Sequence, residues 1–321
     1  MSNLEDRPDE LVCAAARGGV EVMTPRDVPL GGPRAMTVRR TLPQRERSLI
    51  GAWCFLDHYG PDDVADTGGM TVAPHPHTGL QTVSWLFTGE VEHRDSAGHH
   101  AVVRPGELNL MTAGHGISHS EVSPASVRTL HGAQLWVALP ADARDGAPRF
   151  DHYAPPAVQG EGWTARVFLG SLLGSTSPVP TATPLLGAEL VLTAGTEVHL
   201  DVDASYEHGV LVDTGVVSLG EVEVEEHELA YLPPGSQRLS VDAHEDARVL
   251  LLGGPPFGEP IVMWWNFVGR SHEEVVAFRE DWMAQLEAGA YADGRFGVPT
   301  GNTLAPIPAP ALPNARLRER R

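Results

Sequence analysis

One proline between two histidines constrains this chain more than any other residue. In Pro74-His75-Pro76-His77, Pro76 has no backbone N–H to donate and its ring clashes with a preceding helical turn, so a helix is disfavoured there. An extended strand is the expected alternative, and side chains two residues apart on a strand point to the same face. The imidazoles of His75 and His77 are therefore expected to lie side by side on one face of a strand.

A second pair with the same alternate spacing follows about forty residues later, in His119-Ser120-Glu121. Two strands that each present such a pair to one face can surround a single ion. Three imidazoles and one carboxylate form a nitrogen and oxygen ligand set that suits a divalent first-row metal and suits calcium poorly. We therefore predict a metal site with His75, His77, His119 and Glu121 as ligands. These ligand types leave iron, nickel, manganese and zinc open, and they leave coordination positions for water, substrate or dioxygen.

Short strands separated by glycine and proline predict an all-β fold. Residues 80–87 are rich in β-forming side chains and end at the turn Thr88-Gly89-Glu90, and residues 91–95 are the next predicted strand. Strands at intervals of about eight to twelve residues with such turns are typical of a sandwich or a barrel. The length of 321 residues is sufficient for two domains of ordinary size.

The second half of the chain repeats the first half. Residues 210–217 follow the pattern of residues 85–91, and residues 228–235 follow that of residues 107–114, which indicates a duplicated barrel. The ligand pairs are not repeated. The expected counterpart of the first histidine pair is Tyr206-Glu207-His208, whose Glu and His would point to opposite faces, and Leu239-Ser240-Val241 stands in place of the second pair. We expect one barrel to hold metal and its twin to have a structural role.

The predicted organisation has five parts. These are an N-terminal extension (residues 1–36), a metal-binding first barrel (37–140), a connector (141–185), a second barrel with a terminal helix and no metal site (186–290), and a C-terminal tail (291–321). Ser271 and Glu274 form a capping box that begins the helix, and Gly289 is placed to end it. The tail is rich in proline and alanine, so it is expected either to lie along the surface or to be disordered.

The composition favours a cytoplasmic protein. The acidic N-terminus has no apolar segment typical of a secretory signal, and no apolar run reaches the roughly 18 residues of a membrane span. Cys13 and Cys54 could pair by number alone, but without a signal we expect both to be reduced. A net charge of −19 argues against direct nucleic-acid binding, which favours a basic face.

Other polar residues in the first half leave alternatives open. His58 either contacts and orients the metal ligands or makes a structural hydrogen bond. Gln134 presents its amide either to a ligand or to a neighbouring strand, and His115, between two glycines, is a candidate for the mouth of the pocket. His93 and His99 show no ligand pattern, and we expect His99 to be exposed.

These motifs resemble those of the pirin family within the cupin superfamily. Gly69, five further residues and His75-Pro76-His77 follow the cupin pattern, and the stretch from Pro74 to Gly79 has the form of the pirin motif. Residues 111–121 are similar to the second signature of the family, and residues 94–99, 133–137 and 258–267 also match. The resemblance covers about residues 37 to 285. Gln81 departs from the pattern because many members have Glu there, and Thr78 stands where Arg is frequent.

The resemblance implies two cupin, jelly-roll-type barrels packed face to face, with a C-terminal helix. It carries the ligand roles onto His75, His77, His119 and Glu121 and makes iron(II) the first choice of ion, with nickel, manganese, zinc and copper as alternatives. It also implies quercetin 2,3-dioxygenase activity, in which a flavonol ring is cleaved with release of carbon monoxide. Glu121 would then move the hydroxyl proton of the substrate. The alternative is a non-enzymatic, redox-sensing iron protein whose partner is a transcription factor or a metabolic enzyme.

Overall fold

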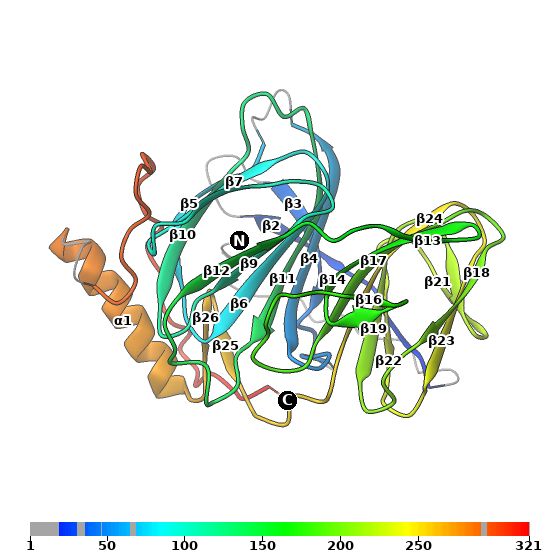
Figure 1. Cartoon of the computed structure of the whole chain (residues 1–321). Coiled ribbons are helices and arrows are strands. Elements are labelled where there is room, and N and C mark those ends of the chain that lie inside the picture. Colours follow the sequence, from blue (N-terminus) through cyan, green and yellow to red (C-terminus); the bar gives the residue numbers. More distant parts are fainter. Residues whose placement is uncertain (1–18, 31–35, 46, 65–68, 290–293, 321) are drawn as a thin grey trace.

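The computed structural model describes residues 19–30, 36–45, 47–64, 69–289 and 294–320. Within them the chain forms two β-barrels that lie side by side, with one long helix beyond the first barrel (Figure 1). Each barrel consists of a seven-stranded sheet and a four-stranded sheet. The prediction of an all-β fold with two barrels and a C-terminal helix is confirmed.

The first barrel contains most strands of the first half of the chain. Its large sheet has the strand order β12 (Arg149–Tyr153), β9 (Leu108–Thr112), β6 (Leu80–Thr88), β11 (Thr129–Ala138), β4 (Trp53–Asp63), β3 (Met36–Leu42) and β2 (Arg26–Leu30). Its small sheet has the order β5 (Thr71–His77), β10 (Ile117–Val122), β7 (Val91–Asp95) and β8 (His100–Val103).

The second barrel repeats this arrangement. Its large sheet has the order β1 (Glu21–Met23), β22 (Leu229–Leu232), β19 (Glu207–Thr214), β24 (Ala247–Gly254), β17 (Leu186–Leu192), β14 (Trp163–Leu169) and β13 (Val158–Gly160). Its small sheet has the order β18 (Glu197–Asp201), β23 (Arg238–Ala243), β20 (Val217–Leu219) and β21 (Val222–Val224). Because β9-β6-β11-β4 and β22-β19-β24-β17 follow the same order, the predicted internal repeat is confirmed.

Segments predicted as an extension and a connector contribute strands to these sheets. β1 pairs with β22 of the second barrel, whereas β2 pairs with β3 of the first barrel. β12 extends the large sheet of the first barrel, and β13 and β14 belong to the second. A short hairpin of β15 (Ser171–Leu172) and β16 (Ser175–Thr176) follows. The N-terminal strand therefore lies on one barrel and its successor on the other.

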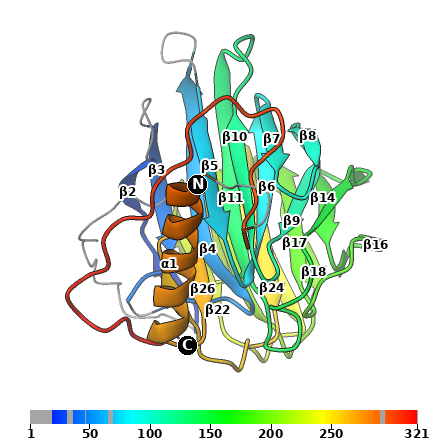
Figure 2. The same cartoon turned by 90° about the vertical axis from the view of Figure 1, so that its left-hand side faces the viewer.

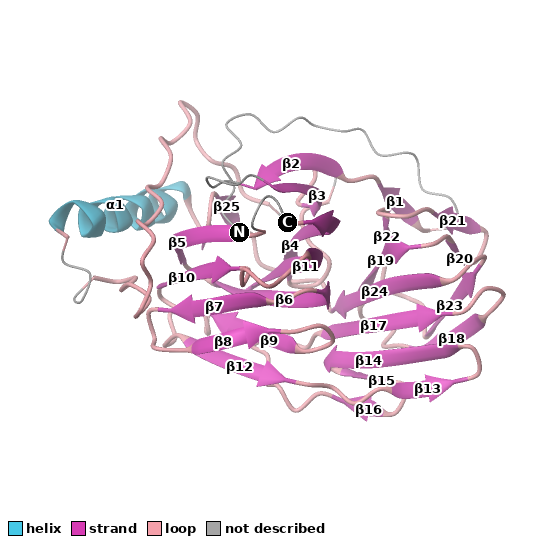
Figure 3. Cartoon of the chain, turned by 90° about the horizontal axis from the view of Figure 1, so that it is seen from above, coloured by secondary structure: helices cyan, strands magenta, loops and turns pink. Residues whose placement is uncertain are grey.

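The two large sheets pack against each other and share one apolar core. Trp53, Val83 and Trp85 of the first barrel are in the same buried cluster as Phe168 and Leu250 of the second. A strand between a barrel interior and another barrel is covered on both faces. Residues 80–86 of β6 are accordingly all buried, including the polar Gln81, Thr82 and Ser84. Figure 3 shows the two barrels from above.

The helix α1 (His272–Ala288) begins and ends as predicted. The Ser271 side chain accepts a hydrogen bond from the Glu274 backbone N–H, and Gly289 caps the C-terminus with a left-handed φ of 58°. The predicted division grouped this helix with the second barrel, which it follows in the sequence. The helix packs on the hairpin β25 (Val262–Trp264) and β26 (Phe267–Gly269), which is joined to β5 of the first barrel, and Arg144 pairs with Glu274 at 2.6 Å. Sequence adjacency does not determine which barrel covers the apolar face of a helix.

The C-terminal segment lies along the surface, the first of the two expected alternatives. The Ile307 N–H donates to the Pro74 carbonyl on β5, and the Ile307 carbonyl accepts from Trp282 Nε1 at 2.9 Å. At its end, Arg320 pairs with Ile261 through backbone hydrogen bonds. Figure 2 shows this segment passing over α1 and the small sheet of the first barrel. No helix among the described residues is long and apolar enough to cross a membrane.

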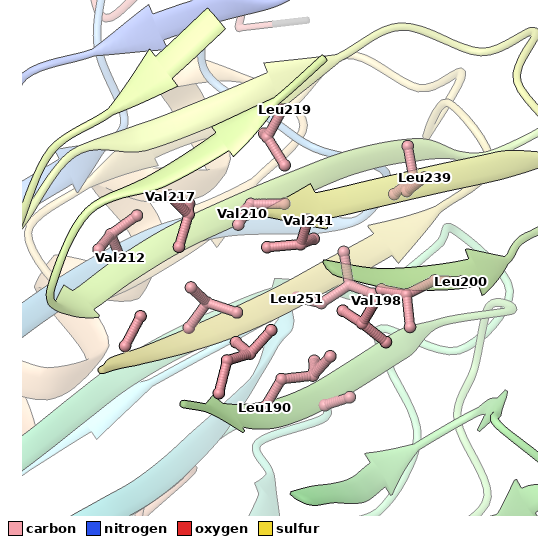
Figure 4. Close-up of a cluster of buried hydrophobic side chains, with 14 of the residues drawn as sticks. Leu190, Val198, Leu200, Val210, Val212, Val217, Leu219, Leu239, Val241 and Leu251 are labelled. Carbon is pink, nitrogen blue, oxygen red and sulfur yellow. The ribbon is translucent and has the colours of Figure 1, made fainter. Parts of the chain in front are cut away.

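The interior of the second barrel is apolar where the first carries its ligand pairs. On β23, Leu239 and Val241 point inward, and Leu239 faces Leu200 of β18 (Figure 4). The structural counterpart of the first histidine pair therefore lies on β18. The prediction that Tyr206-Glu207-His208 is this counterpart was wrong, because Glu207 is the first residue of β19. Branched aliphatic side chains fill the second barrel, which agrees with a structural role for it.

Candidate metal centre

Three of the predicted ligands converge inside the first barrel. His75 and His77 lie on β5 and His119 on β10, and the antiparallel register places His119 directly opposite His75. All three are fully buried, at 0% exposure. One ligand nitrogen from each lies within 4.8 Å of the other two. The alternate spacing on two paired strands has brought these imidazoles together in the way that the strand period requires.

Backbone carbonyls determine the tautomers of His75 and His77. His75 Nδ1 lies 2.9 Å from the Ala73 carbonyl oxygen, and His77 Nδ1 lies 3.1 Å from the Asn266 carbonyl oxygen. A carbonyl oxygen can only accept a hydrogen bond, so each Nδ1 must carry the proton. A neutral imidazole has one N–H, which leaves the Nε2 atoms of both rings with lone pairs.

Side chains determine the tautomer of His119. Its Nδ1 lies 3.3 Å from His93 Nδ1, and His93 Nε2 lies 3.2 Å from Asp95 Oδ2. The ionised carboxylate accepts from His93 Nε2–H, so His93 Nδ1 has a lone pair and accepts from His119 Nδ1–H. The proton is thus drawn to Nδ1 of His119, and its Nε2 also has a lone pair.

Three lone pairs therefore meet in one buried place. His77 Nε2 and His119 Nε2 are 3.0 Å apart with no proton available to lie between them. His75 Nε2 is buried and has no hydrogen-bond partner among the described residues. Burial is the first cause that lowers the pKa of all three imidazoles well below 6.5, so they remain neutral. Neutral imidazoles with converging lone pairs form a site that a divalent cation stabilises, and the donor set fits a first-row metal.

The fourth predicted ligand, Glu121, is buried on the same strand but lies outside this trio. β10 is regular against β7, so Glu121 and His119 share a face, and Glu121 faces His93 across the pair. The register against β5 is irregular, because His119 pairs with His75 whereas Glu121 pairs with Val72. Glu121 and Tyr59 are both buried, at 2% and 1% exposure, and burial and, next, the Glu121 carboxylate raise the pKa of Tyr59. The ligand role of Glu121 stays a prediction.

The structure decides the alternatives for the other polar candidates. Gln134 accepts a hydrogen bond from Ser84 Oγ at 2.8 Å, so its amide oxygen bonds a neighbouring strand. His115 is exposed, and its Nδ1 donates to a backbone carbonyl at 3.1 Å. Gln81 donates to Thr112 Oγ1 at 2.8 Å. The sequence argument missed His93 and Asp95, although their alternate spacing repeats that of the ligand pairs on an adjacent strand.

A second cluster of titratable side chains lies at the seam between the barrels. His58 and His131 of the first barrel approach the same oxygen of Asp213 in the second barrel, at 2.6 and 2.5 Å. All three are buried, and Arg248 pairs with the other Asp213 oxygen at 3.1 Å. Arg39 Nε lies 3.4 Å from His58 Nδ1, so that nitrogen is the acceptor and Nε2 carries the proton. His58 and His131 therefore join the first barrel to Asp213 by hydrogen bonds, and the ion pair of Asp213 with Arg248 lies within the second barrel. This is the structural role left open for His58.

Replacing His58 with glutamine is expected to flatten the pH dependence of stability. Burial lowers the pKa of His58 to about 4, although the hydrogen bond that its Nε2–H donates to Asp213 raises the pKa. Between pH 6.5 and pH 4 the His58 imidazole binds a proton in the unfolded protein but stays neutral in the folded protein. The free energy of unfolding therefore falls as the pH drops from 6.5 towards 4. At about 1.36 kcal/mol per pKa unit, this loss is about 3 kcal/mol at most.

Glutamine keeps an N–H near the position of Nε2 and cannot titrate. Urea unfolding of the wild type and His58→Gln between pH 7 and pH 4 compares the two slopes. A shallower profile for the variant is expected, and two parallel profiles would contradict the assignment.

Comparisons with known proteins agree with this architecture. The family model Pirin matches residues 35–137, and the model of the pirin C-terminal cupin domain matches residues 187–286. A Pseudomonas aeruginosa protein named "Putative quercetin 2,3-dioxygenase PA1205" is 45% identical over 318 residues, which cover 97% of this chain and 98% of that protein. The crystal structure of a quercetin 2,3-dioxygenase from Acinetobacter baumannii is similar with a TM-score of 0.85 and 38% identity, and covers 94% of this chain and 97% of that one.

A more distant structure shows the same fold. The bacterial pirin YhhW from Escherichia coli, solved in complex with nickel(II), has a TM-score of 0.59 and 21% identity, and covers 74% of this chain and 99% of that one. Both halves of the chain match, and the two barrels share one strand order. The chain therefore belongs to the pirin family of the cupin superfamily.

Proposed function

We propose that this protein is a metal-dependent dioxygenase that cleaves the central ring of a flavonol, in the manner of a quercetin 2,3-dioxygenase. The observation that carries the proposal is the convergence of three lone-pair nitrogens inside the first barrel. Two of them are 3.0 Å apart, and no proton is available to lie between them. The names of the relatives that match nearly the whole chain support the choice of substrate class.

The trio of His75, His77 and His119 would hold the ion, with Glu121 as the fourth ligand. Iron(II) is the ion that we propose, and nickel, manganese, zinc and copper are the alternatives that the same nitrogen and oxygen donors accept. The ion supplies a positive charge that lowers the pKa of a hydroxyl group bound to it, so the flavonol binds as its anion.

The Glu121 carboxylate is the proposed acceptor of the 3-hydroxyl proton. It is buried at 2% exposure and faces the interior that the three histidines line. In the overall reaction both atoms of dioxygen are added, the C2–C3 and C3–C4 bonds break, and C3 leaves as carbon monoxide. The remaining atoms form the ester of the two aromatic fragments, so no further oxidant or reductant is required.

Replacing Glu121 with glutamine is expected to lower flavonol turnover by about 100-fold or more, because general-base catalysis contributes about 10²–10⁴-fold. The assay follows the loss of flavonol absorbance in air with protein loaded with iron(II). The metal content of the variant is measured in parallel, so that a lost ion and a lost proton acceptor are told apart.

Unimpaired turnover by Glu121→Gln would remove the proposed role of the carboxylate. The same assay separates the two classes of function. An enzyme consumes many flavonol molecules per chain, whereas a redox-sensing regulator binds metal at the same trio and consumes none.

A further inference from the structure

The carboxylate of Asp95 is buried near the proposed metal ligands and is held in a fixed orientation. Its side chain is fully buried, and its Oδ1 atom accepts backbone N–H bonds from Ala97 and His99, each at 3.0 Å. His99 Nδ1 also lies 3.1 Å from Oδ2. A carboxylate held by two backbone donors and a turn has little freedom to rotate, so the direction in which it accepts further bonds is fixed.

His93 connects the Asp95 carboxylate to His119. It lies on β7, is only 4% exposed, and bonds Asp95 through Nε2 and His119 through Nδ1, at 3.2 and 3.3 Å. Phe150 of β12 packs on the ring of His93 with centroids 4.9 Å apart and stacks on His99 at 5.4 Å. The orientation of the His93 ring is therefore held by hydrogen bonds at both nitrogens and by packing against Phe150.

The three histidines of the trio differ in what orients them. His75 and His77 donate to backbone carbonyls, which any substitution elsewhere leaves in place. His119 depends on two side chains, since its Nδ1 proton lies against His93 and not against a carbonyl. Without an acceptor at that position, the proton of a neutral imidazole can move to Nε2, and the lone pair would then point away from the ion.

We propose that Asp95 and His93 are positioning residues that keep the lone pair of His119 on Nε2 and so set the metal affinity of the site. This inference rests on the trio of the proposed function. It gives the hydrogen bonds that link Asp95, His93 and His119 a role in metal binding and not in the packing of the barrel. Partners that orient a metal-binding histidine in this way typically change metal affinity by about 10–100-fold when they are removed.

Cobalt(II) is the probe, because its visible spectrum reports the ligand set and its affinity can be measured against a competing chelator. His93→Phe removes the acceptor and is expected to lower cobalt affinity by about 10–100-fold and to change the spectrum. His93→Asn places an amide oxygen near the former Nδ1 atom and should recover most of the affinity. His100→Asn is the matched control, because the His100 side chain is half exposed and bonds Glu92, which is not part of the trio. The cobalt affinity of this variant should equal that of the wild type.

The outcomes distinguish this inference from the proposed function. A wild type that binds no cobalt would overturn the metal site itself. A wild type that loses cobalt on His119→Ala, together with a His93→Phe variant that binds as tightly as the wild type, would overturn only the positioning role. Should His93→Phe fail to fold, Asp95→Asn is measured in the same two ways. Its single amide oxygen stays with the two backbone donors, so an amide N–H faces His93 Nε2 and favours the proton on His93 Nδ1. A loss of cobalt affinity is expected, and an affinity equal to that of the wild type would overturn the positioning role.

Discussion

Replacing His119 with alanine is expected to abolish metal binding and flavonol turnover together. The change removes one of three converging lone pairs and leaves only two imidazoles of the trio, His75 and His77, both on β5. The loss of affinity should exceed the roughly 10–100-fold change expected for a partner that only orients a ligand. Metal content after dialysis and a chelator competition both measure it.

The second barrel offers a matched control for this variant. Leu239 occupies the position of His119 on the equivalent strand β23 and is buried among aliphatic side chains. Leu239→Ala should lower the free energy of unfolding by about 2–5 kcal/mol through the cavity it leaves. It should leave the metal affinity unchanged. Equal metal content in wild type and His119→Ala would contradict the assignment of the ligand.

Replacing Asp213 with alanine is expected to destabilise the protein by about 3–5 kcal/mol, the usual effect of breaking a buried ion pair by removing one partner. The variant would leave the N–H groups of His58 and His131 without their acceptor and would remove one of the two carboxylates that Arg248 contacts. All of these groups lie at the seam, so the docking of the two barrels is weakened as well.

Urea unfolding measures this effect, with Asp201→Ala as the control. Asp201 also pairs with an arginine in the second barrel, but its side chain is 84% exposed. Exposed pairs contribute about 0–1 kcal/mol, so that variant should unfold near the wild-type midpoint. A loss at Asp213 no greater than that at Asp201 would show that the seam does not depend on the carboxylate.

The local part of the site could be predicted because it follows from the strand period. Pro76 disfavours a helix, and alternate residues on a strand share a face, so His75 and His77 had to lie together. The pairing of β5 with β10 then brought His119 to the same place. The period could not place Glu121 relative to the ion, because the irregular register of β5 lies at that point.

Contacts between segments far apart in the chain could not be predicted from the sequence. Asp213 is 155 residues from His58, and their contact exists only because the two large sheets dock face to face. The counterpart of the histidine pair was misplaced for a related reason. β18 carries Val198 and Leu200 at the inward positions. Many strands carry such an aliphatic pair, so the pair does not identify β18 as the counterpart. The role of His93 was missed because hydrogen bonds between rings depend on proton positions that spacing does not reveal.

X-ray absorption spectroscopy of the iron(II)-loaded wild-type protein tests the central claim most directly. The account predicts one ion per chain, with scattering from three imidazole rings in its coordination shell. That scattering should fall when any one of His75, His77 and His119 is replaced. A bound ion without imidazole scattering, or a protein that retains no metal after loading and dialysis, would contradict it.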